Sequence, residues 1–80
     1  MEYIATVCSH FGAIKLKKIL DKYNIVSKLS PVPRSLSSSC GTCVLYNFNK
    51  FYPEEKIIDD IDKIFQITEN QNYKILYTKV

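Results

Sequence analysis

Alternation between strand-like and helix-like segments predicts an α+β fold for this 80-residue chain. Four segments rich in β-branched and aromatic residues are typical of strands. Two longer segments repeat their apolar residues at helical spacing. The predicted order along the chain is β-α-β-β-α-β. This order predicts a ferredoxin-like two-layer sandwich, in which two helices pack on one face of a four-stranded antiparallel sheet.

The first half of the chain is expected to form strand, helix and strand. Residues 2–8 are rich in β-branched and aromatic side chains and predict the first strand. Ser9 follows as a favoured N-cap, because its hydroxyl can accept from the free amides of a first helical turn. A helix is expected over residues 10–23, and the second strand over residues 25–29, before Pro31, which cannot donate to a sheet ladder. The apolar stripe of the helix consists of Phe11, Ile14, Leu16, Ile19, Leu20 and Tyr23.

The second half is expected to begin with a loop over residues 31–41, which is dominated by Pro, Ser and Gly. A third strand is expected over residues 43–48. Pro53 suits the first turn of a second helix, which should end before Asn70. A last strand is expected over residues 73–80. The apolar stripe of the second helix, repeating at i, i+1, i+4, i+7 and i+8, consists of Ile57, Ile58, Ile61, Ile64 and Phe65.

The length of the chain predicts a single domain, residues 1–80, with one modest core. Little room remains for an enclosed pocket, so we expect a site on the surface or at an end of the sheet. The formal charge of +3 is mild. A dense basic patch with aromatics, typical of nucleic-acid binders, is missing from the sequence. The predicted core consists of Val7, Ile14, Leu20, Leu45, Ile57, Ile61, Ile64 and Ile75.

Cysteine usage and the first residues predict a cytoplasmic protein that does not enter a membrane. Residues 1–8 contain an acid and lead directly into strand-like alternation, unlike a signal peptide. The sequence contains no apolar run near the roughly 20 residues that span a bilayer. Three cysteines, an odd number, fit poorly with a structural disulfide framework. Since cytoplasmic thiols are kept reduced, we expect functional thiols.

Reactive chemistry is concentrated in the segment Ser37-Ser38-Ser39-Cys40-Gly41-Thr42-Cys43. The small neighbours of Cys40 should leave its thiol accessible and let backbone amides approach the group that the sulfur carries. Arg34 is the only arginine and shares this loop. A nearby cation favours the thiolate, which is the reactive form of cysteine.

The predicted topology should bring His10, the only histidine, to the same loop. If the first two strands are parallel, the turn after the first strand and the loop after the second lie at one end of the sheet. The positive N-terminus of the first helix would point there as well. We therefore expect Cys40 to be the most reactive thiol, with a pKa below the value of about 8.5 for free cysteine. Cys8 and Cys43, in or beside strands, should be buried.

Cys40 and Cys43 also form a Cys-x-x-Cys pair, which is compatible with dithiol redox chemistry or metal binding. In an extended chain their Cα atoms would lie about 10 Å apart, beyond the roughly 7 Å that a disulfide allows. The pair could close only if Gly41 turns the chain, and Cys43 could equally be a buried strand residue. Cys8 and His10 could complete a zinc site, but their spacing is not that of a typical half-site. We therefore expect neither a metal nor a cofactor.

The segment Pro31-Val32-Pro33-Arg34-Ser35-Leu36-Ser37-Ser38-Ser39-Cys40-Gly41 resembles a family of short bacterial and archaeal proteins. They are known as DUF3343, or putative Se/S carrier protein-like, and share a similar Pro-x-Pro-Arg followed by serines and Cys-Gly. The resemblance covers essentially the whole chain and implies a carrier of sulfur or selenium bound to a cysteine. It implies that Cys40 holds the atom, with Arg34 and Gly41 in support. Cys43 lies outside the shared segment.

The leading hypothesis is therefore a thiol carrier. Cys40 would accept sulfur or selenium from a donor protein, hold it as a persulfide or selenosulfide, and pass it to an acceptor. The alternatives are a non-catalytic binding or regulatory module, and a dithiol redox or metal-handling protein. The sequence leaves open whether the protein is an enzyme and what its oligomeric state is. The candidate reacting residues are Cys40, Cys43 and Arg34, and the candidate binding residues are Ser38, Ser39, Gly41 and His10.

Overall fold

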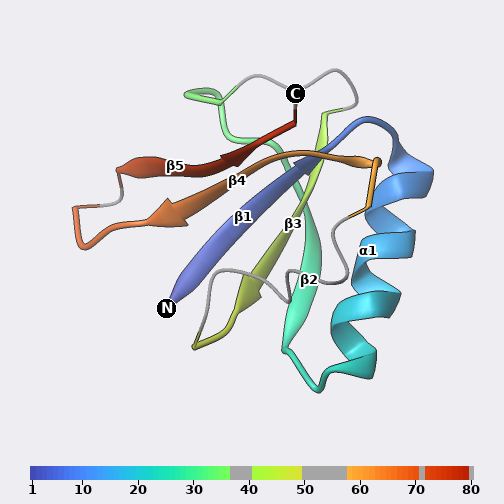
Figure 1. Ribbon diagram of the computed structural model, residues 1–80. Helices are drawn as coiled ribbons and strands as arrows, with labels where there is room; N and C mark the ends of the chain where they lie inside the picture. Colours follow the sequence, from blue (N-terminus) through green and yellow to red (C-terminus); the bar gives the residue numbers. More distant parts are fainter. Residues whose placement is uncertain (37–40, 50–57, 71, 80) are drawn as a thin grey trace.

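The computed structural model describes residues 1–36, 41–49, 58–70 and 72–79. In this part of the chain one helix packs against a five-stranded antiparallel sheet (Figure 1). The α+β class is therefore confirmed, although the sheet has one strand more than expected. The elements are β1 (Glu2–Val7), α1 (His10–Lys22), β2 (Ser27–Pro31), β3 (Thr42–Asn47), β4 (Ile61–Ile67) and β5 (Tyr73–Thr78).

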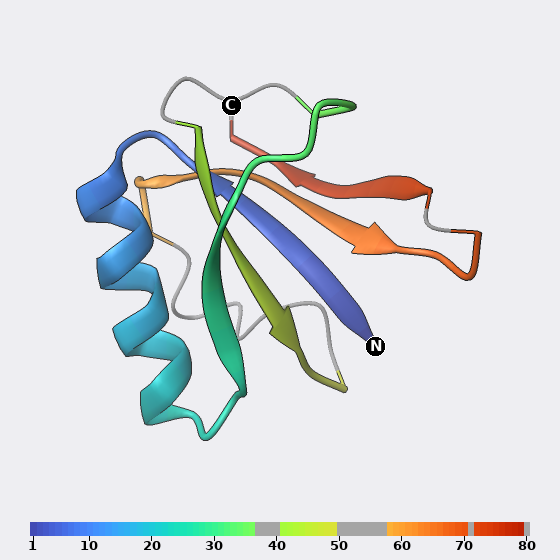
Figure 2. The ribbon, with the colours of Figure 1, turned by 180° about the vertical axis from the view of Figure 1, so that it is seen from behind.

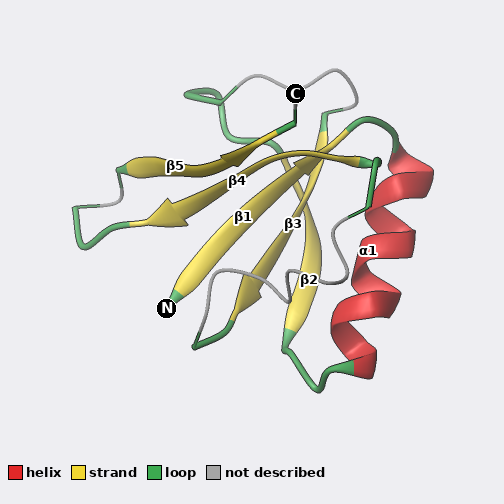
Figure 3. Cartoon of the chain, in the orientation of Figure 1, coloured by secondary structure: helices red, strands yellow, loops and turns green. Residues whose placement is uncertain are grey.

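The strands follow the order β2-β3-β1-β4-β5 across the sheet (Figure 2). β3 lies between β1 and β2, and all neighbouring strands are antiparallel, so β1 and β2 run in the same direction. Together with α1 they form a split βαβ unit. The helix covers one face of this unit (Figure 3). β4 and β5 extend the sheet on the other side of β1.

The predicted second helix is wrong where the structure describes it, because Ile61–Ile67 forms strand β4. Residues 53–57 of that prediction lie outside the described residues. The error has a structural cause in the pairing of β4 with β1. Ala5 pairs with Ile64 and Val7 pairs with Ile61, so two residue steps on β1 match three on β4. This bulge turns Ile61 and Ile64 toward the same core at the i, i+3 spacing of a helix.

The core lies between α1 and the sheet face that it covers. Every second residue of β1, from Tyr3 to Val7, points into it. Of the predicted core residues, Val7, Leu20, Ile61 and Ile64 are fully buried. The full cluster of buried residues consists of Tyr3, Ala5, Val7, Ala13, Leu16, Leu20, Ile25, Val44, Tyr46, Ile61 and Ile64.

Three predicted core residues are not fully buried. Ile14 is 40% exposed, because Ala13 and Leu16 turn the other side of α1 toward the sheet. Ile75 is 56% exposed on β5, which is the edge strand of the sheet. Leu45 is half-buried. Ile57, the remaining predicted core residue, lies outside the described residues.

Truncating Ile61 should destabilise the protein far more than truncating Ile75. Ile61→Ala is expected to lower the free energy of unfolding by about 2–5 kcal/mol, because it leaves a cavity in the core. Ile75→Ala removes a similar side chain from a mostly exposed position and should cost at most about 1 kcal/mol. Denaturant titration of both variants measures the difference. Equal losses would contradict the orientation of β4 in the sheet.

Candidate functional site

The ends of several strands meet at one end of the sheet, as the split βαβ topology predicts. The last pair of β1 with β3 joins Thr6 to Cys43, and the last pair of β2 with β3 joins Pro31 to Thr42. β1 and β2 therefore finish where β3 begins, and α1 starts there (Figure 1). We call this region, formed by residues 8–10, 32–36 and 41–43, the cysteine end.

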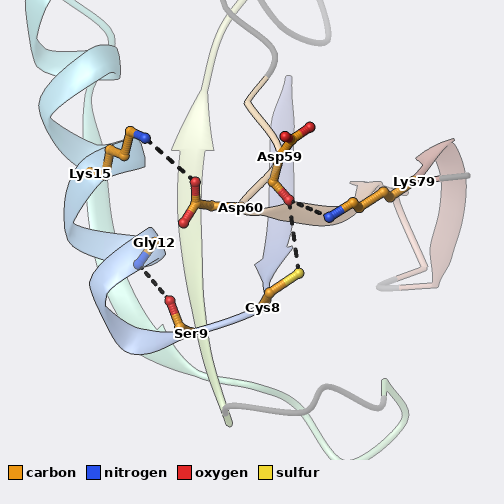
Figure 4. Close-up of polar contacts among 7 residues, drawn as sticks. All are labelled: Cys8, Ser9, Gly12, Lys15, Asp59, Asp60 and Lys79. Atoms are coloured by element: carbon orange, nitrogen blue, oxygen red, sulfur yellow. Dashed lines mark hydrogen bonds and ion pairs between the residues drawn. The ribbon is translucent and has the colours of Figure 1, made fainter.

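Ser9 is the N-cap of α1, as predicted. Its backbone is extended, with φ −155° and ψ 161°, and its Oγ accepts a hydrogen bond of 3.0 Å from the Gly12 amide (Figure 4). Cys8 precedes it and lies in neither β1 nor α1. The Cys8 amide donates to the Asp60 carbonyl oxygen at 2.8 Å, which fixes the backbone at this junction.

Cys8 is exposed, so the expectation that it is buried is wrong. Its thiol Sγ lies 3.9 Å from the Asp59 carbonyl oxygen, to which Lys79 Nζ also donates at 2.8 Å (Figure 4). The sequence carried a signal for this position. A cap at Ser9 places the preceding residue between two elements, where neither the sheet nor the helix covers its side chain.

The turn before β4 presses against the first turn of α1. A Cβ atom on Gly12 would lie only 2.8 Å from the Asp60 Cβ, closer than real side chains approach. Lys15 Nζ forms an ion pair with Asp60 Oδ1 at 3.6 Å (Figure 4). Glycine is therefore needed at position 12 because of this close contact. The contact holds Cys8 and the start of α1 in place.

His10 connects the start of α1 to the start of β3. Its Nδ1 lies 3.5 Å from Thr42 Oγ1, and its side chain is exposed. Thr42 directly follows Gly41, so His10 does lie beside the end of the candidate loop. The expectation that topology would bring these distant segments together is confirmed for the described residues.

Cys43 is fully buried in β3. Its Sγ donates to the Pro31 carbonyl oxygen at 3.6 Å. Its partner in β1 is Thr6, and its neighbour Val44 faces the core under α1, so Cys43 occupies the opposite sheet face. The interpretation of Cys43 as a buried strand residue is therefore confirmed.

Backbone hydrogen bonds hold the described residues on both sides of the predicted loop. The Val32 amide donates to the Gly41 carbonyl oxygen at 3.1 Å, and Gly41 adopts a positive φ of 72°. Arg34 is exposed in a turn in which the Leu36 amide donates to the Pro33 carbonyl oxygen at 3.0 Å. Ser38, Ser39 and Cys40 lie outside the described residues.

The described part of the chain contains neither a cluster of metal-ligating side chains nor a membrane-spanning helix. His, Cys, Asp and Glu side chains do not gather there in a group of three that could hold a metal ion. None of the helices described is long and apolar enough to cross a bilayer. Cys8 and Cys43 are free cysteines.

Gly12→Ala should destabilise the protein, although alanine usually favours a helix over glycine by about 0.5–1 kcal/mol. The added Cβ clashes with Asp60, and overpacking of this kind costs about 1–3 kcal/mol. Thermal or denaturant unfolding measures the change. Combining Gly12→Ala with Asp60→Gly should recover most of the loss, because the clashing carbon is removed. A stabilised single variant would show that the two turns do not touch.

The chain matches the family described as "Putative Se/S carrier protein-like" over residues 2–78. Comparison with curated proteins and with solved structures gave no match. The matched range includes every strand and the helix of the structure. The chain therefore belongs to the Se/S carrier protein-like family.

Proposed function

We propose that this protein carries sulfur or selenium as a persulfide or selenosulfide on Cys40, taken from a donor protein and passed to an acceptor. Membership of the Se/S carrier protein-like family is the observation that carries the proposal. The arrangement of the described residues supports it. The segment that contains Cys40 joins β2 to β3, and the described residues on either side of it, Leu36 and Gly41, belong to the cysteine end.

Burial argues against Cys43 as the carrier thiol. A carrier sulfur must be reached by two other proteins in turn, and Cys43 has no exposed surface. Its thiol already contacts the Pro31 carbonyl oxygen. The burial of Cys43 therefore argues against a dithiol reaction between Cys40 and Cys43. It also argues against a metal site that uses Cys43.

Gly41 supports the proposal through its backbone. At its φ of 72° a side chain would be strained, although an added Cβ would have no atom within 4 Å. Glycine is therefore favoured at position 41 by its backbone conformation, and not by a lack of room for a side chain. The Gly41 carbonyl accepts from Val32, so the chain leaves β3 in a fixed direction at the residue next to the carrier cysteine.

Positive charge near the loop would favour the Cys40 thiolate. Arg34 belongs to the same connection between β2 and β3, and it is exposed. The N-terminus of α1, which carries the positive end of the helix dipole, begins at the cysteine end. Both features are of the kind that lowers the pKa of a thiol.

The transfer itself is a thiol exchange in which atoms and electrons balance. The Cys40 thiolate attacks the outer sulfur of a donor persulfide. A new bond forms between that sulfur and Cys40 Sγ, the bond to the donor sulfur breaks, and the donor leaves as a thiolate. An acceptor thiolate repeats the exchange on the loaded Cys40. Attack at either stage needs an accessible, deprotonated thiol.

Loading with sulfur tests this proposal directly. After incubation with inorganic polysulfide, the intact mass of the wild-type protein should rise by one sulfur atom, and a reductant should reverse the change. Cys40→Ser should lose this gain, whereas Cys43→Ala, which alters a buried thiol, should keep it. Equal loading of Cys40→Ser and wild type would rule out Cys40 as the carrier residue.

Alkylation of the native protein should rank the three thiols. We expect Cys40 to react fastest and at lower pH than a thiol in an unstructured peptide, Cys8 to follow because it is exposed, and Cys43 to be protected. Mass spectrometry of the peptides locates the label. Reductant should leave the melting temperature nearly unchanged, because Cys40 and Cys43 are not expected to form a structural disulfide. Early labelling of Cys43 would contradict its burial.

A further inference from the structure

The outer surface of α1 combines exposed apolar side chains with a row of lysines. The inner side of the helix consists of the buried residues Gly12, Ala13, Leu16 and Leu20. Phe11 and Ile14 lie on the outer side, where the two residues are 68% and 40% exposed. Residues three, four or seven positions apart share one face of a helix. The outer face, which we call the α1 stripe, consists of Phe11, Ile14, Lys15, Lys18 and Lys22.

The positive charge of the protein is concentrated on α1. The helix contains four lysines and one aspartate, a net charge of +3 that equals the formal charge of the whole chain. The aspartate, Asp21, pairs with Lys17 at 3.4 Å, and neither residue belongs to the α1 stripe. Lys15 pairs with Asp60 at 3.6 Å, but its side chain remains 53% exposed. The α1 stripe therefore presents positive charge around two exposed apolar side chains.

The α1 stripe begins at the cysteine end. Phe11 directly follows His10, whose Nδ1 lies 3.5 Å from Thr42 Oγ1 at the start of β3. The cap by Ser9 and the close packing of Gly12 hold this first turn of the helix in place. Exposed aromatic residues are enriched at protein interfaces. A protein that contacts Phe11 is therefore brought next to the cysteine end.

We propose that the α1 stripe is the docking surface for a partner protein whose contact surface is acidic and has an apolar recess for Phe11. The inference deepens the proposed carrier function, and it rests on that function for the partner's role, which is to exchange the carried atom at the cysteine end. Opposite charges speed and orient the encounter of two proteins. Burial of Phe11 then holds the partner in a defined place.

The charge and size of the α1 stripe argue against other occupants. In a symmetric dimer through this face, the lysines of the two copies would lie against each other, and like charges repel. A helix that binds a membrane uses a broad apolar face, whereas the apolar side of α1 is buried. A helix of this length spans about 20 Å, which fits the small interfaces of transient protein complexes.

Photochemical cross-linking from position 11 identifies the partner. The full chain, with a photoreactive phenylalanine analogue in place of Phe11, is produced in its native cells and exposed to light. The matched control carries the analogue in place of Val26, which is 81% exposed beyond the C-terminal end of α1. We expect a protein that is cross-linked from position 11 and not from position 26.

The cross-linked protein, once purified, is the probe for binding measurements. Phe11→Ala should raise the Kd at least about tenfold, as loss of an interface anchor does. Lys18→Glu should slow association at least about threefold at low salt, and the effect should shrink as salt screens the charges. Val26→Ala and Lys74→Glu, which replace exposed residues away from α1, should change either value by less than about twofold.

The outcomes separate this inference from the carrier proposal. The docking surface is overturned if position 11 yields no specific cross-link, or if it cross-links only a second copy of the chain, lipid or nucleic acid. Equal affinity of Phe11→Ala and wild type, or binding that does not depend on salt, overturns it as well. Failure of Cys40 to load with polysulfide would remove the partner's role, whereas the binding measurements would still decide whether the surface exists.

Discussion

The central constraint on this fold is the pairing of β1 with neighbours on both edges. β1 pairs with β3 on one side and with β4 on the other, and its residues from Tyr3 to Val7 are buried on both faces. Backbone groups buried this deeply must find partners, and the two ladders supply them. The place where β1 ends therefore fixes where α1 starts, where β3 begins, and where Cys8 leaves the sheet.

The bulge opposite β1 is stabilised by a buried side chain. Thr6 is fully buried, and its Oγ1 accepts from the Lys63 amide at 3.1 Å. The side chain thus partners a backbone donor of β4 at the point where the register shifts. The presence of a fully buried hydroxyl in β1 is explained by this role, since an unpaired buried donor is costly.

Much of the first half of the fold could be predicted from sequence, because its signals are local. Ser9 caps α1, and the apolar stripe and Pro31 mark the helix and the end of β2. In the second half, the strands expected over residues 43–48 and 73–80 correspond to β3 and β5. The expected helix was wrong, because the spacing of Ile61 and Ile64 reflects a bulge that depends on pairing with β1. Apolar residues spaced three apart predict a helix when the strand that pairs with the segment is unknown.

The candidate site was predictable to a similar degree. The prediction that His10 lies near the start of β3 was correct, because the parallel strands β1 and β2 end on the same side of the sheet. The burial of Cys8 was predicted wrongly, because the first strand was expected to reach Cys8, whereas β1 ends at Val7 and the Cys8 amide bonds to Asp60, far along the chain. Local sequence cannot report how a distant turn holds a backbone in place.

Both edges of the sheet carry features that oppose further strand pairing. On either side of β2, the Val26 carbonyl oxygen accepts from the Asn47 amide and the Val32 amide donates to the Gly41 carbonyl oxygen. The alternating pattern therefore turns the backbone of Pro31 outward, where it offers no amide. On β5, the register shift between Ile64 and Phe65 interrupts the straight edge. Prolines and bulges at such edges discourage open-ended aggregation. Copies of a thiol protein kept apart in this way are less prone to be joined by intermolecular disulfides when an oxidant is present.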